Sequence, residues 1–171
     1  FQNIRLFAEM TALENVMVGR HIRTRSGLFG AMLRTREFLE EERAIAARAQ
    51  ELLDYVGIGR FADYRARTLS YGDQRRLEIA RALATDPQLI ALDEPAAGMN
   101  ATEKVMLREL IDRIRKDNRT ILLIEHDVKL VMGLCDRVTV LDYGKQIAEG
   151  TPAEVQKNQA VIEAYLGTAA H

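Results

Sequence analysis

The sequence predicts an α/β protein in which helices cover a parallel sheet, joined to a part built from helices alone. From residue 69 onward, short apolar strands alternate with helices, which is the rhythm of parallel sheets. Residues 11–68 contain only helical patterns. With 171 residues, of which 47% are hydrophobic and 29% charged, the chain is long enough to bury a sizeable core.

The first helices are expected within residues 11–68. One begins at Thr11, before a helix-forming run that reaches residue 21. Another is predicted over residues 35–57, where apolar side chains recur at helical spacing and Gly57 is placed to end the helix. The apolar positions on its inner face include Ile45, Ala49, Leu52, Leu53 and Val56.

A helix–strand–helix unit follows. Ser70 is a candidate N-cap for a helix that stops before Pro87. Within residues 88–93, the four residues from Leu89 to Leu92 are apolar and run straight into the final aspartate, which is typical of a strand covered on both faces. Asn100 and Glu103 have the spacing of a capping box for the next helix.

The last third of the chain continues the alternation of strands and helices. We expect a strand at 120–125, a helix at 127–135, a strand at 137–142, a hairpin turn into an edge strand at 143–150, and helices at 151–155 and 160–167. Pro152 stands at the first position of its helix, where the missing N–H has no cost.

Chemically useful side chains follow two of the predicted strands. Asp93, Glu94 and His126 lie at carboxyl ends of strands, which meet at the edge where parallel sheets bind ligands. Asp93 has the hard oxygen ligands that suit Mg²⁺, and Glu94 is then free to accept a proton from an attacking water. His126 is a candidate contact for a terminal phosphate. Taken singly, Asp93 also suits a helix cap and His126 an ordinary turn.

A second candidate site lies at the start of a helix. Ser70 and Gly72 expose a hydroxyl and backbone N–H groups at a helix N-terminus, an arrangement that favours an anion. An ordinary capped helix is the alternative interpretation of these residues.

Composition excludes several classes of protein. A net charge of −1 argues against a broad nucleic-acid-binding surface. The single Cys135 excludes an internal disulfide and a cysteine metal cluster. No apolar run approaches the ~20 residues needed to span a bilayer, so we expect no direct insertion into a membrane.

Residues 69–95 resemble the signature motif and Walker B strand of ATP-binding cassette (ABC) ATPases, and the similarity extends over nearly the whole chain. Tyr71, Asp73 and Asn100 depart from the family, replacing its more usual glycine, glutamine and aspartate. The matching motifs are a Q-loop at Gln2, a signature loop of Leu69, Ser70, Tyr71, Gly72 and Asp73, Walker B ending at Asp93, a catalytic glutamate at Glu94, a D-loop reaching Asn100 and a switch histidine at His126.

The resemblance implies a P-loop NTPase-like ABC ATPase core with a parallel sheet and an α-helical subdomain. It divides the chain into a Q-loop segment (1–10), the α-helical subdomain (11–68), the ATPase core (69–150) and a C-terminal helical segment (151–171).

It also implies ATP and Mg²⁺ as ligands. Asp93 and Gln2 would approach the metal, while Glu94 and His126 would be catalytic. Nucleotide binding would involve Gln2, the signature residues Leu69, Ser70, Tyr71, Gly72 and Asp73, and Asn100.

A finer similarity is to the ATPase subunits of branched-chain amino acid importers, carried by residues 69–85, 93–104 and the segment 19–42. This implies a second ATPase subunit, identical or different, paired head to tail, and transmembrane permease subunits docked on the helical part. It implies a peripheral protein on the cytoplasmic face of a bacterial inner membrane.

The phosphate-cradling string G-x-x-x-x-G-K-[ST] does not occur in these 171 residues. We therefore expect a piece of a longer protein, truncated before its Walker A and first strands, that alone binds Mg-ATP weakly or not at all. Two alternatives remain: an ABC ATPase that does not serve transport, and a non-catalytic folded fragment.

Overall fold

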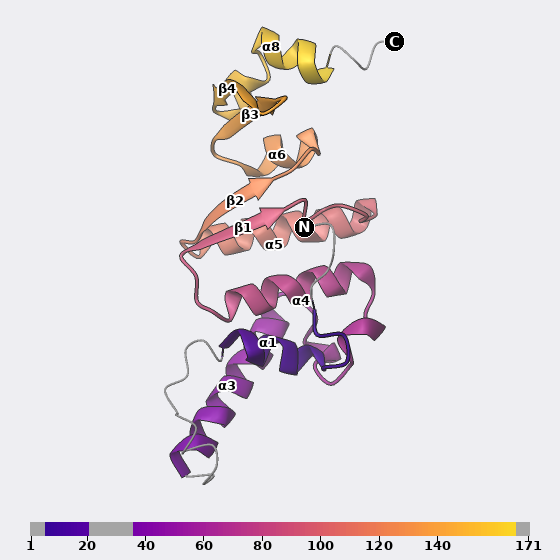
Figure 1. The fold of residues 1–171 in the computed structure, drawn as a ribbon, viewed down its shortest axis with the longest axis vertical. Coiled ribbons are helices and arrows are strands. Elements are labelled where there is room, and N and C mark those ends of the chain that lie inside the picture. Colours follow the sequence, from indigo (N-terminus) through magenta and orange to yellow (C-terminus); the bar gives the residue numbers. More distant parts are fainter. Residues whose placement is uncertain (1–5, 21–35, 167–171) are drawn as a thin grey trace. The chain divides into compact units, whose positions relative to one another are not determined.

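The computed structural model describes residues 6–20 and 36–166, and the chain divides into two compact units. The first unit comprises Phe1–Ile90 and Ala97–Leu122, and the second comprises Ala91–Ala96 and Leu123–His171. Figure 1 follows the elements along the chain. Among the described residues, no helix is long and apolar enough to cross a membrane.

Helices and strands lie where the sequence patterns place them, with shifts of a residue or two at their ends. The helices are α1 (Ala12–Arg20), α3 (Arg36–Tyr55), α4 (Tyr71–Leu83), α5 (Ala101–Lys116), α6 (Val128–Leu134), α7 (Pro152–Val155) and α8 (Gln159–Val161), with shorter helical turns η2 (Gly59–Phe61), η3 (Ala66–Thr68) and η4 (Ile162–Leu166). The strands are β1 (Leu89–Asp93), β2 (Thr120–Ile124), β3 (Val138–Asp142) and β4 (Lys145–Gly150).

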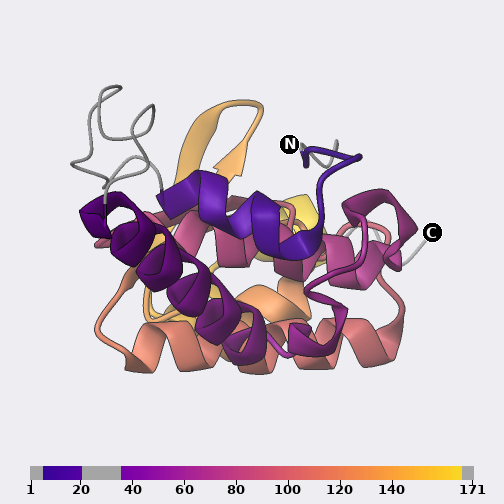
Figure 2. The same cartoon turned by 90° about the horizontal axis from the view of Figure 1, so that it is seen from below.

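In the first unit, α1 packs against both α3 and α4 (Figure 2). The predicted inner face of α3 is confirmed, since Ile45, Ala49, Leu52, Leu53 and Val56 are all buried. Helix α3 ends in a Schellman motif, as the predicted glycine cap requires. Gly57 has a φ of 82° and its N–H donates to the Asp54 carbonyl, while the next N–H, of Ile58, donates to the Leu53 carbonyl.

One buried amide holds the loop that leads into α1. Asn15 is fully buried, and its Oδ1 accepts from the Phe7 N–H at 2.9 Å. Its Nδ2 lies within hydrogen-bonding distance of the carbonyls of Phe7 (3.0 Å), Met10 (3.4 Å) and Thr11 (2.9 Å). The loop is thereby fixed with Phe7 and Met10 exposed, so these side chains are not part of the core.

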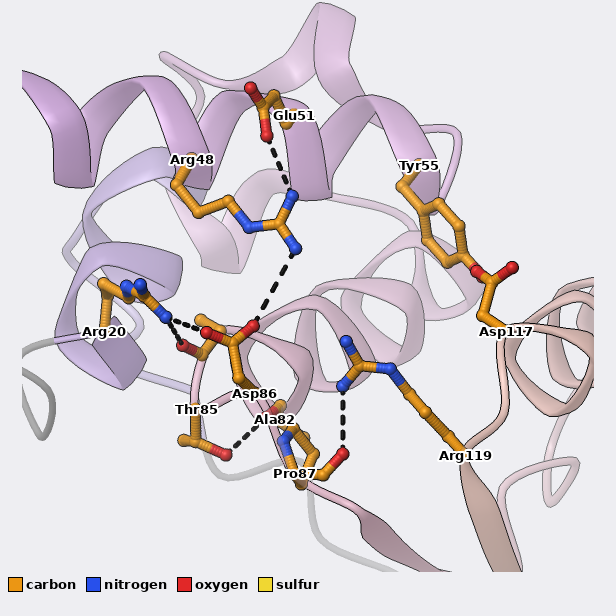
Figure 3. Close-up of polar contacts among 11 residues, drawn as sticks. Arg20, Arg48, Glu51, Tyr55, Ala82, Thr85, Asp86, Pro87, Asp117 and Arg119 are labelled. Atoms are coloured by element: carbon orange, nitrogen blue, oxygen red, sulfur yellow. Dashed lines mark hydrogen bonds and ion pairs between the residues drawn. The ribbon is translucent and has the colours of Figure 1, made fainter.

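Charged side chains join the end of α4 to α1 and α3 (Figure 3). The Asp86 carboxylate accepts a hydrogen bond from Arg20 and lies 3.8 Å from Nη2 of Arg48. On the other side of the same turn, Arg119 Nη1 donates to the Pro87 carbonyl at 3.1 Å. This turn therefore connects the three helices to the start of β2.

Strands β1 and β2 pair in parallel. The Thr120 N–H donates to the Gln88 carbonyl at one end, and the Glu94 N–H donates to the Ile124 carbonyl at the other. The expectation that β1 is covered on both faces is wrong for the described residues. Only Ile90 of this strand is buried, while Leu89 is 56% exposed. Exposure alternates along β1 and β2 because one face of a strand points away from the packed side.

In the second unit, β3 and β4 form the predicted antiparallel hairpin. The βαβ rhythm led us to expect β3 in the parallel sheet, but in the described chain β3 pairs with β4 in a separate two-stranded sheet. A small apolar core lies beneath this hairpin, and Pro152 opens α7 as predicted, behind a capping box of Thr151 and Glu154. The buried members of that core are Val138, Ala148, Val155 and Val161.

Candidate functional site

The candidate catalytic carboxylate stands directly after β1, in the second unit. Glu94 has a φ of 47°, a left-handed conformation that costs a residue with a side chain about 1–2 kcal/mol. Its N–H donates to the Ile124 carbonyl at 2.8 Å, so the last bond of the β1–β2 pairing holds the strained residue. Backbone strain of this kind clusters at functional sites.

Glu94 faces the candidate histidine. Nδ1 of His126 lies 3.3 Å from Oε1 of Glu94, and the Glu94 side chain is 29% exposed against 72% for His126. The two parallel strands thus bring together the two residues that the sequence predicted to be catalytic. A half-buried carboxylate beside an exposed imidazole suits proton transfer to or from a bound water.

Glu125, which sequence reasoning did not single out, links the turns that follow these strands. Its side chain is 1% exposed. Oε1 accepts from the Ala96 N–H at 3.0 Å, while Oε2 accepts from the N–H groups of His126 (3.1 Å) and Asp127 (3.4 Å). The position of Glu125, next to a histidine at the end of a strand, could have pointed to this residue. Its partner Ala96 lies 29 residues away in the sequence, however, and no local pattern indicates the contact.

Asp93 ends β1 with an exposed side chain. Among residues 6–20 and 36–166, no group of three His, Cys, Asp or Glu side chains is placed to hold a metal ion. Mg²⁺ is commonly held by one or two carboxylates together with phosphate oxygens and waters, so a single exposed aspartate fits that ion. Gln2, the other expected metal contact, lies outside the described residues.

The signature residues lie in the first unit, at the start of α4. The predicted cap is confirmed: Ser70 Oγ accepts from the Asp73 N–H at 3.2 Å and donates to the Asp73 carboxylate at 2.8 Å. Leu69 is buried, and its carbonyl accepts from Gln74. Asp73, which replaces the usual glutamine, therefore turns back onto the serine.

The start of α4 contacts the start of α5. A Cβ added to Gly72 would lie 2.7 Å from Oε1 of Glu103, so a larger residue there would require the Glu103 side chain to move. A Cβ added to Gly98, whose φ is 75°, would lie 3.3 Å from the Tyr71 ring. Asn100 caps α5 in the predicted capping box with Glu103. The structure thus brings the signature residues against the D-loop residues of the same chain.

Comparisons with known proteins agree with these motifs. A family model described as ABC transporter matches residues 1–97, which is more than half of the chain. This chain belongs to the ABC transporter ATP-binding family. A second model, described as branched-chain amino acid ATP-binding cassette transporter, matches residues 145–171.

Relatives of this ABC chain cover it almost from end to end. It is 49% identical over 170 residues to LivG of Salmonella typhimurium, a high-affinity branched-chain amino acid transport ATP-binding protein, covering 99% of this chain and 67% of LivG. It is 46% identical, with the same coverage, to BraF of Pseudomonas aeruginosa, which carries the same description.

A solved ATP-binding cassette of an ABC transporter, in its ADP conformation, matches with a TM-score of 0.73 and 28% identity. The match covers 94% of this chain and 64% of the solved one. The chain therefore spans about two thirds of the length of these proteins.

Proposed function

We propose that the protein containing this chain hydrolyses ATP to drive the uptake of branched-chain amino acids. The observation that carries the proposal is the pairing of Glu94 with His126 at the ends of two parallel strands. This geometry occurs in a chain that is 49% identical to a branched-chain amino acid transport ATP-binding protein.

In the proposed reaction, Glu94 accepts a proton from the water that attacks the γ-phosphate. Its carboxylate is held in place because the backbone of residue 94 is tied to β2. His126, more exposed than Glu94, contacts the phosphate that leaves. General-base assistance of this kind typically contributes ~10²–10⁴ in rate.

Asp93 and Gln2 would hold Mg²⁺, Asp93 through water. The ion supplies charge neutralisation at the phosphates, which is the main requirement of phosphoryl transfer. The phosphate cradle is not among these 171 residues, so in this proposal it comes from the remaining third of the protein.

The signature residues would act on a second ATPase subunit. Ser70 and Gly72 stand at the N-terminus of α4, where the helix dipole favours the γ-phosphate bound by the partner. Leu69, Tyr71, Asp73 and Asn100 surround them in the proposed interface. Closure of two such subunits would exclude water and complete both sites.

Transmembrane permease subunits would bind the helical part. The exposed Phe7 and Met10, on the loop held by Asn15, are apolar side chains available for that contact. The protein would then lie on the cytoplasmic face of a bacterial inner membrane. The chain is only 32% identical to LptB of Escherichia coli, a lipopolysaccharide export ATP-binding protein. This lower identity favours amino acid uptake over lipopolysaccharide export as the transport that the protein drives.

The test is Mg-ATP turnover by the intact protein and by its Glu94→Gln variant. We expect turnover to fall ~10²–10⁴-fold while ATP binding survives, because the amide keeps the shape and removes the base. Glu109→Gln, a change at an exposed carboxylate of α5, serves as the matched control. Full turnover by Glu94→Gln would contradict the role of Glu94. Absence of ATP-dependent uptake of leucine in a reconstituted transporter would contradict the transport assignment.

A further inference from the structure

Glu125 carries a buried carboxyl group that the proposed chemistry does not use. Its side chain is only 1% exposed, and burial of a carboxylate is costly unless hydrogen bonds compensate for the lost water. Three backbone N–H groups provide that compensation, those of Ala96, His126 and Asp127. Hydrogen bonds to an ionised acceptor are about twice as strong as neutral ones.

The two oxygens of Glu125 serve different segments. Oε1 holds the turn that follows β1, through Ala96, and Oε2 holds the turn that follows β2, through His126 and Asp127. One side chain thus bridges the two turns that carry Glu94 and His126. A neutral amide cannot replace it, because one of its two positions becomes a donor facing an N–H group.

The bridge restrains Glu94 from both sides. The Glu94 N–H is bound to the Ile124 carbonyl, and two residues later the Ala96 N–H is bound to Glu125. Between them lies the buried Pro95, whose ring fixes its own φ. Adjacent residues of β2 and its turn therefore hold the chain immediately before and after the carboxylate.

We propose that Glu125 is a positioning residue for ATP hydrolysis, which holds Glu94 and His126 at their working separation. The inference rests on the proposed hydrolysis, and it assigns to Glu125 no contact with ATP. Without the bridge, Glu94 is free to relax from its left-handed φ of 47°, which moves the carboxylate away from His126. Misplacement of a reacting group by about 1 Å costs on the order of 10²-fold in rate.

The test compares Glu125→Gln with Glu163→Gln, an exposed carboxylate of the same unit, in the intact protein. We expect Glu125→Gln to lower kcat by about 10–10²-fold with KM for ATP nearly unchanged, because the residue acts on geometry and not on binding. In a Glu94→Gln background the same change should cost nothing further, since residues that act as a unit are not additive. Glu163→Gln should match the wild type.

Amide hydrogen exchange supplies a measurement that does not depend on activity. In Glu125→Gln, exchange at the amides of Ala96 and His126 should become faster, while exchange in β3 and β4 stays as in the wild type. An inactive wild-type protein would count against the proposed hydrolysis. The hydrogen-exchange data would then still test whether Glu125 holds the two turns together. Unchanged kcat, unchanged exchange at Ala96, or a loss fully additive with Glu94→Gln would each overturn the inference.

Discussion

Nδ1 of His126 lies 3.3 Å from Oε1 of Glu94, across the ends of two strands whose residues are about 30 positions apart in the sequence. The Glu94 N–H reaches the Ile124 carbonyl and so fixes the strand pairing at the site itself. An error in the register of β1 against β2 would separate the pair, because each residue of shift turns a side chain to the opposite face.

His126→Ala should lower the rate of phosphate release without abolishing ATP binding. We expect the rate of ATP turnover to fall by about 10²-fold or more. This is the usual cost of removing one polar group that stabilises charge in the transition state. Steady-state kinetics of the intact protein measure this loss. Tyr143→Ala, at a 99% exposed side chain of the β3–β4 hairpin, is the control. Equal activity of His126→Ala and the wild type would remove His126 from the catalytic pair.

Asn15→Ala should destabilise the protein by about 1–3 kcal/mol, because it removes the acceptor of the part-buried Phe7 N–H and the second donor that the loop carbonyls share. The Phe7 N–H and carbonyl both lose the bonds that Asn15 supplies. Urea unfolding measures the change, with Gln146→Ala on an exposed strand position as the control. A loss equal to that of the control would show that the loop holds its conformation by other contacts.

Local patterns predicted what depends on neighbours in the sequence. The caps at Ser70 and Asn100, the glycine end of α3 and the inner face of α3 all follow from spacing within a few residues, and all are confirmed. The same helical spacing places Leu107, Leu110, Ile111 and Ile114 of α5 on its buried face.

Predictions failed where the outcome depends on segments distant in the sequence. We expected β1 to be buried on both faces, which requires elements packed on each of them. We also expected β3 in the parallel sheet, but it pairs with β4, the strand that follows it in the hairpin. Glu125 could not be identified for the same reason, since its bond to Ala96 exists only once β1 and β2 are paired. The four-part division of the chain and the role of Gln2 stay predictions.

Gly98→Ala should destabilise the turn before α5 by more than Gly144→Ala destabilises the β3–β4 hairpin. Both glycines have positive φ, 75° and 77°, so both alanines carry backbone strain of about 1–2 kcal/mol. Only at Gly98 would the new Cβ also press on a ring, that of Tyr71, because nothing lies within 4 Å at Gly144. Urea unfolding of the two variants measures the difference. Adding Tyr71→Ala should recover the excess at Gly98, and failure to do so would show that the ring is not the obstacle.

Tyr55 should titrate unusually late. Burial, followed by the hydrogen bond from its hydroxyl to Oδ2 of Asp117 (2.7 Å; Figure 3), raises the pKa of Tyr55 from 10.0 to about 12. A raised pKa in the folded state means that folding favours the protonated phenol. The stability gained from it is complete below pH 10 and is lost as the pH rises toward 12.

Comparison of the wild type with Tyr55→Phe isolates this contribution, because other groups that titrate in the same range are common to both proteins. The difference in their free energies of unfolding should shrink between pH 10 and pH 12, and the difference in ultraviolet absorbance should report one late tyrosinate. Asp117→Asn should lower the pKa of Tyr55, yet leave it above 10 because burial remains the larger cause. If Tyr55 instead ionises with the ordinary tyrosines, the contact between the end of α3 and the turn after α5 does not form in solution.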